Sequence, residues 1–551
     1  MAMPCGSLRP SAAGQALRRC ASAAQAPHVA VIGAGLVGLA SANSLRHRGL
    51  RVTLIDRQPT VSGECSYANA ALLMRSYSRP KTATPRQLLR WATSRSEPVH
   101  VSWRALVDPS MTAFGLRFLL AGPQTEKKTQ EITQITDRLA QMSIEKIETA
   151  IADKRLPVKI NKGGLLMFFR DAVKFHAMVE EAESSFAPEE RAGRFRVVSP
   201  DECIDLEPAL AKQKASIVGG VFWHPDQTVC PLAFSKQLAA SLQAEDVKFM
   251  LGEEVVALDA PQTAAAASSA SACVRFASGK ELMADAVVLA AGVGTGALLR
   301  KLGPCDAPPV PLYGMRGHSV TLDASNLPQI GHTDHVLKRS VCDADNMVFF
   351  SPIPHEEGRP DGHRLVRIAA FGDFDGWGYG PESIRPWRMK QLFSVAKQNL
   401  GEDIFLSSGG VKALGTSPAL PLSSLGDQLC PDVDPATRWC GLRPMSPDGL
   451  PVVGAVGAVG AAPIFINAGH GALGWTLSAG TGEVLAQTVS KSLGRSTAAD
   501  EASASGANHS AELARLAAHL EPSRFRWSEV LRRGFGMHFG QATEDGKVST
   551  A

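Results

Sequence analysis

The most regular hydrophobic pattern in the chain runs from His28 to Arg57. The apolar run "HVAVI" leads into a glycine-rich turn, "LVGLASANSLRH" repeats its apolar positions at helical spacing, and "RVTLID" is a second apolar run that ends at Asp56. A strand, a helix and a second strand in this order predict a βαβ unit whose two strands are parallel.

Longer polar and shorter apolar segments follow this unit. From Tyr77 to Ile151 the spacing is mostly helical, and "GGLLMFF" from Gly163 and "GGVFWHPDQTVCP" from Gly219 predict strands. We expect "MVFFSPIP" and "RLVRIAAFGDFDGW" to be antiparallel strands of a second sheet, and "VKFMLGEEVVAL" and "ELMADAVVLAAGVG" to be core strands of the first domain. The chain therefore crosses between two domains more than once.

This alternation predicts an α/β protein with a discontinuous first domain, residues 27–110, 235–305 and 435–490. Residues 111–234 and 306–434 would form a second domain around an antiparallel sheet, and residues 491–551 an Ala/Ser-rich loop and a C-terminal helical tail. A length of 551 residues suits two domains.

Composition narrows the function classes. The formal net charge is +4 and no basic stripe with interleaved aromatic residues occurs, which argues against nucleic-acid binding. The ten cysteines form no CxxC pair and no Cys/His cluster, so no metal site is expected. Residues 1–26 contain three arginines and no acidic residue, which is typical of a mitochondrial presequence; without targeting, a cytoplasmic location is expected.

The βαβ unit carries a dinucleotide-binding signature. Gly33, Gly35 and Gly38 form GxGxxG between strand and helix, and Asp56 follows at the end of the second strand. Glycines permit a tight turn and a close approach of backbone to a pyrophosphate, while an acidic residue accepts hydrogen bonds from a ribose. This motif alone leaves NAD and FAD open. "ADAVVLAAGVGTGALL" from Ala284 resembles a second dinucleotide-side segment of flavoproteins.

Six further motifs carry a family resemblance. They are "SYANA" from Ser66, "GGLLMFFR" from Gly163, "DLEPAL" from Asp205, "LYGMRGHSVT" from Leu312, "GLRPMSPDG" from Gly441 and "NAGHGALGWT" from Asn467. Over residues 28 to the late 480s the chain resembles the FAD-dependent D-amino-acid dehydrogenases of the small-subunit type, in the D-amino-acid oxidase and glycine oxidase superfamily. The resemblance implies a discontinuous Rossmann-like FAD-binding domain and an antiparallel-sheet substrate domain.

The resemblance also implies a cofactor site. Its residues would be Gly33, Gly35, Leu36, Val37, Gly38, Asp56, Arg57, Asn69, Ala70, Val255, Ala290, Gly292, Gly469, Gly471, Ala472, Leu473, Gly474 and Trp475. The last five open a predicted helix, whose unpaired N–H groups and positive dipole end would face the flavin's pyrimidine edge and stabilise negative charge there.

Three residues are candidates for catalysis. Arg443 would hold a substrate carboxylate through two parallel hydrogen bonds; alternatively it pins its turn by bonding carbonyls or Asp448. His470 would act in catalysis or line the flavin. Tyr313 lies on a strand whose period of two places Tyr313, Met315 and Gly317 on one face, and Gly314, Arg316 and His318 on the other.

The implied reaction is oxidation of a D-amino acid by hydride transfer from Cα to flavin N5, giving a 2-oxo acid and ammonia, with electrons passed to a quinone or oxygen. Ala71 and Leu72 depart from the family pattern, which leaves open a related amine substrate such as glycine, sarcosine or a proline-like compound, or a flavin-binding subunit without activity. An NAD-dependent reductase is the third alternative. The helical stretch "SMTAFGLRFLLAG" from Ser110 is either a peripheral membrane contact or plain core.

Overall fold

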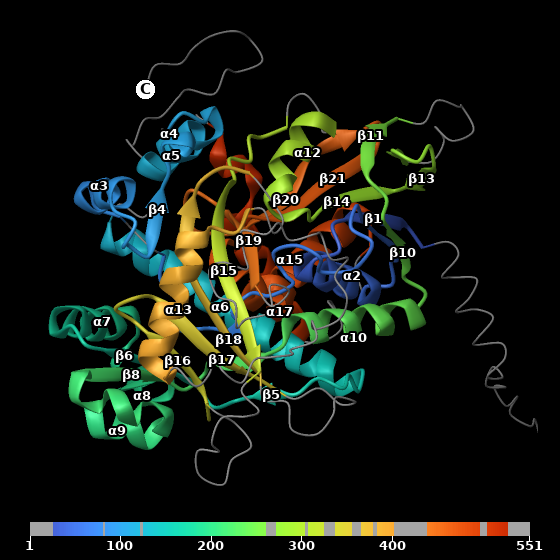
Figure 1. The fold of residues 1–551 in the computed structure, drawn as a ribbon. Coiled ribbons are helices and arrows are strands. Elements are labelled where there is room, and N and C mark those ends of the chain that lie inside the picture. The colour runs from blue at the N-terminus through green and yellow to red at the C-terminus, as the bar shows by residue number, and fades with distance from the viewer. Residues whose placement is uncertain are drawn as a thin grey trace, which may run out of the picture.

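The computed structural model describes residues 26–80, 83–121, 125–260, 271–302, 307–323, 337–354, 365–377, 383–401, 438–495, 504–526 and 530 (Figure 1). The predicted presequence lies outside the described residues except for Ala26, and it stays a prediction.

The βαβ unit forms the centre of a six-stranded sheet. Its strands are β10 (Lys248–Leu251), β2 (Arg51–Asp56), β1 (His28–Ile32), β14 (Ala286–Leu289), β21 (Ala462–Ala468) and β20 (Val452–Val459), in that spatial order. All neighbours are parallel except β20 with β21. Parallel neighbours need a crossover, which α2 (Leu36–His47) provides between β1 and β2.

A larger, mostly antiparallel sheet forms the second half of the molecule. Its strands are β19 (Arg438–Met445), β15 (Tyr313–Asp323), β18 (Leu365–Phe374), β17 (Val348–Ile353), β16 (Ser340–Asp343), β6 (Leu165–Phe169), β8 (Gly219–Trp223) and β7 (Phe195–Val198), and β4 (Val99–Val101) also pairs with β18. The predicted antiparallel pairing of "MVFFSPIP" with "RLVRIAAFGDFDGW" is confirmed as β17 with β18.

Two smaller antiparallel sheets complete the strand pairing. One contains β11 (Val255–Asp259), β12 (Ala272–Phe276) and β13 (Glu281–Ala284), and the other β3 (Leu72–Leu73), β9 (Gln227–Val229) and β5 (Ile160–Asn161). Two segments were predicted to be core strands of the first domain. "VKFMLGEEVVAL" contains β10 and the start of β11, and "ELMADAVVLAAGVG" contains β13 and β14. Because β10 and β14 join the six-stranded sheet and β11 and β13 do not, the prediction was wrong for β11 and β13. The strands β4 and β19 fall inside the predicted first domain yet pair within the large sheet.

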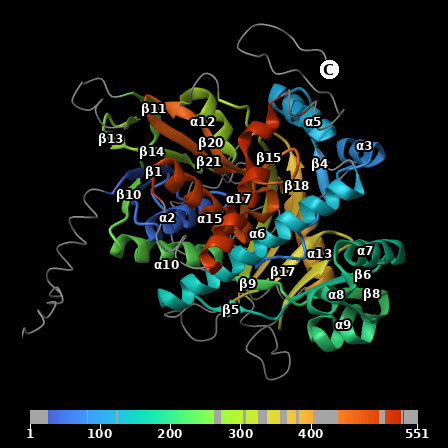
Figure 2. The same ribbon diagram turned by 180° about the vertical axis from the view of Figure 1, so that it is seen from behind.

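Helices cover both sheets. Around the six-stranded sheet lie α10 (Pro231–Ala244), α12 (Thr295–Leu302), α15 (Gly474–Ser492) and α17 (Ala504–Leu520), with the long α6 (Glu126–Asp153) running beside α15 when the molecule is seen from behind (Figure 2). Near the large sheet lie α3 (Pro85–Thr93), α4 (Trp103–Leu106), α5 (Pro109–Ala121), α7 (Ala172–Ser185), α8 (Pro188–Arg194), α9 (Pro200–Leu206) and α13 (Pro386–Leu400).

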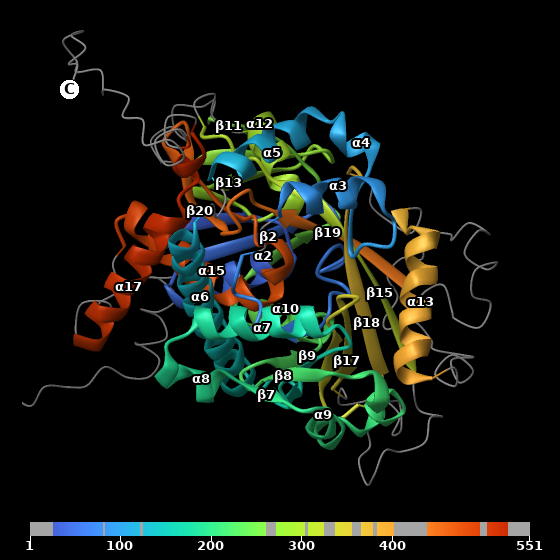
Figure 3. The ribbon, with the colours of Figure 1, turned by 90° about the vertical axis from the view of Figure 1, so that its left-hand side faces the viewer.

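The large sheet has one covered face and one face turned toward the rest of the protein. The helix α13 lies along β18 and β15 on the outer side (Figure 3). Apolar side chains such as Val320, Ile368 and Leu392 fill the layer between this helix and the sheet. The opposite face is therefore the one available to a site between the two halves.

Candidate cofactor and substrate site

The glycine turn after β1 has no room for side chains. Gly33 has a φ of +115°, and a Cβ placed on it would lie 2.4 Å from the carbonyl oxygen of Ala290 at the end of β14. A Cβ on Gly38 would lie 1.8 Å from the Gly33 carbonyl oxygen. The turn and the start of α2 are therefore packed backbone against backbone, as a phosphate-binding turn requires.

Asp56 is held at the carboxyl end of β2 by backbone donors. Its Oδ2 accepts a hydrogen bond from the Ala34 N–H at 2.6 Å, and its Oδ1 accepts one from the Gln58 N–H at 2.8 Å. Burial raises the pKa of Asp56, and these donors oppose that effect. Each carboxylate oxygen keeps further acceptor capacity for a ribose hydroxyl. Arg57, the next residue, forms a half-exposed ion pair with Glu64 at 2.6 Å.

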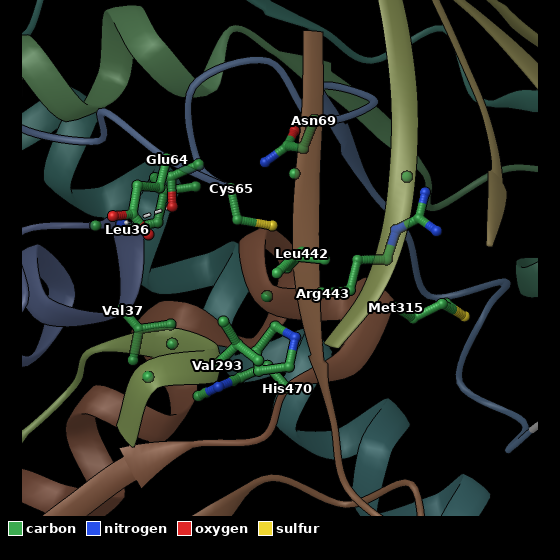
Figure 4. Close-up of a pocket in the computed structure, with 18 of the residues that line it drawn as sticks. Leu36, Val37, Glu64, Cys65, Asn69, Val293, Met315, Leu442, Arg443 and His470 are labelled. Carbon is green, nitrogen blue, oxygen red and sulfur yellow. Dashed lines mark hydrogen bonds between the residues drawn. The ribbon is translucent and has the colours of Figure 1, made fainter. Parts of the chain in front are cut away.

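A cavity of about 1210 Å³ extends from this turn to the large sheet. The predicted site residues that line it are Gly33, Gly35, Leu36, Val37, Asp56, Arg57, Asn69, Ala70, Val255, Ala290, Gly292, Arg443, His470, Gly471, Ala472, Gly474 and Trp475. Figure 4 shows Leu36, Val37 and Glu64 at one end, Arg443 and Met315 at the other, and Cys65, Asn69 and His470 between them. Gly38, Gly469, Leu473 and Tyr313 do not line it.

The amino-terminal end of α15 faces the cavity. The short 3-10 helix η5 (Gly471–Leu473) precedes it, and Gly471, Ala472, Gly474 and Trp475 contribute to the wall. Leu473 points instead into the core, and Gly469 forms the turn before the helix with a φ of +77°. The end of a helix that is 19 residues long presents N–H groups and partial positive charge to whatever lies in the cavity.

His470 is a buried residue beside α15. Its Nε2 lies 2.9 Å from the Thr481 hydroxyl of α15, and burial lowers its pKa to about 3. Its Nδ1 is buried and has no hydrogen-bond partner among the described residues. A group with so low a pKa is a poor general base near neutral pH, so the geometry favours a role as a wall residue that offers one hydrogen bond.

Arg443 lies at the end of the cavity that the large sheet forms, next to Gly317, which has no side chain. A Cβ on Gly317 would lie 2.4 Å from Arg443 Nη2 and 2.6 Å from its Cζ, so the guanidinium rests where a side chain would otherwise be. Arg443 Nη1 donates to the Phe371 carbonyl at 2.5 Å, and Phe371 has a left-handed φ of 67° that is uncommon for a non-glycine residue. Burial lowers the pKa of Arg443.

The alternative in which Arg443 pins its turn through Asp448 does not hold. Arg524, from the C-terminal 3-10 helix η6 (Pro522–Phe525), takes that carboxylate: its Nε donates to Asp448 Oδ2 at 2.7 Å and its Nη2 to Oδ1 at 3.2 Å. Arg443 does bond one carbonyl, that of Phe371, and it is one of the residues that line the cavity.

Tyr313 lies outside the cavity, contrary to the prediction of a catalytic role. Its hydroxyl donates to Asp108 Oδ2 at 3.0 Å, and its side chain is fully buried against Phe114 and Trp377. It shares a strand face with Met315 and Gly317, which do line the cavity, but it lies at the first position of β15 beneath α5. The prediction that Tyr313, Met315 and Gly317 share one face of the strand is confirmed. The two-residue period of a strand does not show at which residue of β15 the cavity ends, so the position of Tyr313 outside the cavity could not be predicted.

An aromatic wall was missed by the sequence interpretation. Phe349, Ala369, Ser319 and Trp439 are opposite one another across β17, β18, β15 and β19, so they share one face in one row. Tyr67 lies over Trp439 with ring centroids 4.7 Å apart, and Tyr77 lies edge-on to Phe349 at 6.5 Å. All six of these residues line the cavity: Phe349, Ala369, Ser319, Trp439, Tyr67 and Tyr77.

The segment that departs from the family pattern is fixed to the large sheet. Ser319 Oγ donates to the Ala68 carbonyl at 2.7 Å, Ser351 Oγ to that of Ala70 at 2.8 Å, and Arg367 Nη1 to that of Asn69 at 3.1 Å. Ala71 has a φ of 60°, a conformation that favours glycine, and Leu72 begins β3. Both side chains point into the apolar core and neither lines the cavity.

A glycine turn between β1 and α2, an acidic residue at the end of β2 and a cavity shared with an antiparallel sheet define an oxidoreductase fold that binds a dinucleotide cofactor. The chain belongs to the FAD dependent oxidoreductase family (DAO), whose family model matches residues 28–488. Its cofactor is therefore FAD.

Individual proteins similar to the chain agree with this family. D-amino acid dehydrogenase of Methylobacterium radiotolerans is 30% identical over 468 residues, covering 84% of this chain and 96% of that protein. D-amino acid dehydrogenase of Vibrio vulnificus is 27% identical over 465 residues, covering 83% and 95%. These relatives are bacterial and lend no support to a mitochondrial location. Among solved structures, glycine oxidase from Bacillus cereus has a TM-score of 0.53 at 17% identity, covering 86% of this chain and 96% of that one.

The residues around the cavity fit FAD. Its volume exceeds the ~300–1,000 Å³ of most small-molecule pockets, which leaves room for a substrate beside the cofactor. Besides His470 Nδ1, the Asn467 Oδ1 and Trp475 Nε1 atoms on its lining residues are buried without a partner among the described residues. Buried polar atoms of this kind are usually satisfied, so a polar ligand is expected to complete them.

Proposed function

We propose that the protein oxidises D-amino acids with FAD, giving a 2-oxo acid and ammonia. The observation that carries this proposal is a single cavity with the glycine turn and Asp56 at one end and the guanidinium of Arg443, which is partly buried, at the other. Two similar proteins, which match this chain over nearly their whole length, are named D-amino acid dehydrogenase. The substrate and the acceptor, a quinone or oxygen, belong to the proposal.

Bound FAD supplies a two-electron acceptor for oxidation of an amine. Arg443 would hold the substrate carboxylate through two parallel hydrogen bonds. Its guanidinium occupies the space that a Cβ on Gly317 would fill, and its Nη1 donates to the Phe371 carbonyl, which fixes its position. Anchoring the carboxylate fixes the orientation of Cα and its hydrogen, which is a positional contribution to catalysis. The imino acid formed from the substrate is hydrolysed by water.

The end of α15 would contribute by electrostatics. Its N–H groups, the partial charge of the helix and the neutral His470 face the cavity from the same side. Such fixed donors stabilise negative charge in a buried site without reorganisation. Asp56 and the glycine turn would hold the dinucleotide portion at the opposite end.

The test is a visible absorption spectrum of the purified flavoprotein, recorded without oxygen before and after adding D-amino acids, L-amino acids, glycine, sarcosine or proline. Bleaching of the oxidised-flavin absorbance by D-amino acids alone is the expected result. Bleaching only by glycine, sarcosine or proline would replace the substrate class, and a flavin that no amine reduces would point to a subunit without activity. Readmitting oxygen or a quinone afterwards identifies the acceptor.

Arg443→Lys provides a sharper version of this test. Lysine keeps the charge but loses the fork, so the variant should retain FAD and show a KM raised at least about tenfold for the reducing substrate. Arg196→Lys, at a half-exposed surface position, is the matched control and should leave KM unchanged. A KM unaffected by Arg443→Lys would remove the carboxylate clamp from the proposal.

A further inference from the structure

The strand β18 is irregular beside the guanidinium of Arg443. Phe371 and Gly372 of β18 together lie opposite Gly317 of β15, so two residues face one, which is a β-bulge. At the same place β18 changes its neighbour on the other edge, because β17 pairs with it as far as Ala370 and β4 from Gly372 onward. Regular strand pairing therefore does not fix the backbone of Phe371, and a bulge of this kind re-aims the groups that it carries.

The backbone conformation of Phe371 needs support from its surroundings. Its φ of 67° lies in the left-handed region, which phenylalanine rarely adopts and which persists only where neighbouring contacts enforce it. The buried ring belongs to the apolar layer between the large sheet and α13, whereas the carbonyl accepts the hydrogen bond from Arg443 Nη1. Whatever holds the ring in that layer therefore also sets the direction of the carbonyl toward Arg443.

Arg388 is the charged residue that meets this ring. It lies in the first turn of α13, which runs along β18 in Figure 3, and its side chain is fully buried. Its Cζ is 4.4 Å from the centre of the Phe371 ring. A guanidinium over an aromatic face is attracted by the ring, and the attraction is stronger when both groups are shielded from water. The contact therefore holds the ring of Phe371 against α13.

Hydrogen bonds fix Arg388 to both strands that meet at the bulge. Its Nη2 donates to Asp373 Oδ1 at 2.6 Å and its Nε to the same oxygen at 3.0 Å, and Asp373 follows Phe371 by two residues on β18. Its Nη1 donates to the carbonyl of Glu97, in the segment that leads into β4, at 2.8 Å, and to Gln391 Oε1 at 2.9 Å. Arg388 itself does not line the cavity, so it acts on the site through Phe371.

We propose that Arg388 is a positioning residue for the carboxylate clamp of this site. Its contact with the ring holds Phe371 in the left-handed conformation, and Phe371 in turn presents its carbonyl to Arg443 Nη1. Because paired hydrogen bonds to a carboxylate need a guanidinium of fixed orientation, a displaced carbonyl weakens the binding of the substrate. The inference deepens the proposed function and rests on it at one point, the binding of a carboxylate by Arg443.

The experiment compares Arg388→Lys with the natural chain, both loaded with flavin. Lysine keeps a positive charge near Asp373 but has no planar face for the Phe371 ring. We expect KM for D-phenylalanine to rise about fivefold or more while kcat changes less than about twofold. The Kd of benzoate, a carboxylate probe followed through the flavin absorbance, should rise by a similar factor. A merely structural role would lower the thermal midpoint and leave both constants unchanged.

Arg524→Lys is the matched control. Arg524 is almost as deeply buried, pairs with Asp448, and has its Cζ 4.4 Å from the centre of the Phe525 ring. None of these three residues lines the cavity. The control variant should therefore lose thermal stability as Arg388→Lys does, and keep KM for D-phenylalanine and Kd for benzoate at their natural values.

Phe371→Gly tests the same connection from the other side and serves if Arg388→Lys does not retain flavin. Glycine adopts a φ of 67° without strain, so this variant keeps the fold, but it offers no ring to Arg388. We expect KM and the benzoate Kd to rise about as much as in Arg388→Lys. Since both residues act through one contact, the double variant should show little further increase.

Unchanged KM and benzoate Kd in Phe371→Gly would overturn the proposal, because the bulge alone would then direct the carbonyl. Effects of the two substitutions that multiply in the double variant would also overturn it. A natural chain that binds no benzoate and is reduced by no amino acid would remove the carboxylate clamp, and the inference with it. If D-amino acids fail to reduce the flavin, yet benzoate binds and both variants weaken its binding, the proposed reaction is wrong and the positioning role of Arg388 stands.

Discussion

The position of Arg443 depends on Gly317 having no side chain. Because a Cβ at this position would overlap the guanidinium at 2.4 Å, Gly317→Ala must displace Arg443 or move β15. We expect the variant to keep FAD but to raise KM for the amino acid at least about tenfold, since a misplaced fork loses one of its two hydrogen bonds. Steady-state kinetics together with the flavin-to-protein absorbance ratio measure both quantities.

Gly193 offers the matched control for this substitution. It lies on the exposed helix α8, and a Cβ there would meet nothing within 4 Å. Gly193→Ala should therefore leave KM and flavin content as they are. If Gly317→Ala lost flavin as well as activity, its role would lie in the fold rather than in positioning Arg443.

The low pKa of His470 makes stability depend on pH. The folded-state pKa is about 3 and the unfolded value is near 6.5, so between these values the unfolded chain binds the additional proton. Stability is fully present above pH 6.5 and falls as pH decreases, by up to about 1.4 kcal/mol per pH unit. The thermal midpoint should drop between pH 7.5 and pH 5, and His470→Gln should make this drop smaller.

The same substitution tests whether His470 acts as a base. Since burial lowers the pKa of His470 to about 3, the imidazole is neutral near pH 7, and the pH profile of kcat/KM should have no limb near neutral pH that disappears in His470→Gln. A limb near neutral pH that is lost in this variant would show that His470 titrates in catalysis.

At the level of elements, local requirements were predictable and long-range pairing was not. The glycine turn and Asp56 could be read from the sequence because a tight turn and a ribose acceptor each need particular residues within a single βαβ unit. That β19 pairs with β15 and β4 with β18 depends on partners more than 100 residues away along the chain. The row of Phe349, Ala369, Ser319 and Trp439 has the same origin, because it exists only once four strands are in register.

This row predicts which side chains a substrate can carry. Phe349 and Tyr77 form one aromatic pair and Tyr67 and Trp439 another, all lining the cavity. We expect bulky apolar or aromatic D-amino acids to have a higher kcat/KM than D-alanine. In Phe349→Ala the preference for D-phenylalanine over D-alanine should fall about tenfold, since apolar contact with the side chain is lost.

Comparing two substrates in one variant provides the internal reference for that experiment. A general loss of activity would lower both values of kcat/KM equally and leave their ratio unchanged, which would argue against a specificity role for Phe349. Val173→Ala, at an exposed position on α7, should alter neither value.

At the scale of the whole molecule, residues 504–526 are integrated into the fold although they lie beyond the span of the family model, which ends at residue 488. The helix α17 packs against α15, and Phe525 is fully buried beside Arg117, whose Nε donates to the Phe525 carbonyl at 3.3 Å. The sequence predicted only a loop and a helical tail for residues 491–551. The residues next to Arg524 in the sequence do not indicate that its partner is Asp448, which is 76 residues away.

Arg524 carries the strongest of these connections. Besides Asp448, its guanidinium donates to the carbonyls of Leu450 and Pro451 at 3.0 Å, just before β20, and both charged side chains are almost completely buried. Arg524→Ala would leave Asp448 buried without its partner, which typically costs about 3–5 kcal/mol. We therefore expect a clearly lower thermal midpoint, measured on the FAD-loaded protein. Arg196→Ala breaks the half-exposed pair with Glu202 and should change stability by less than about 1 kcal/mol. Equal, small shifts in both variants would mean that the C-terminal segment is dispensable, and that β19 and β20 hold the Asp448 turn without it.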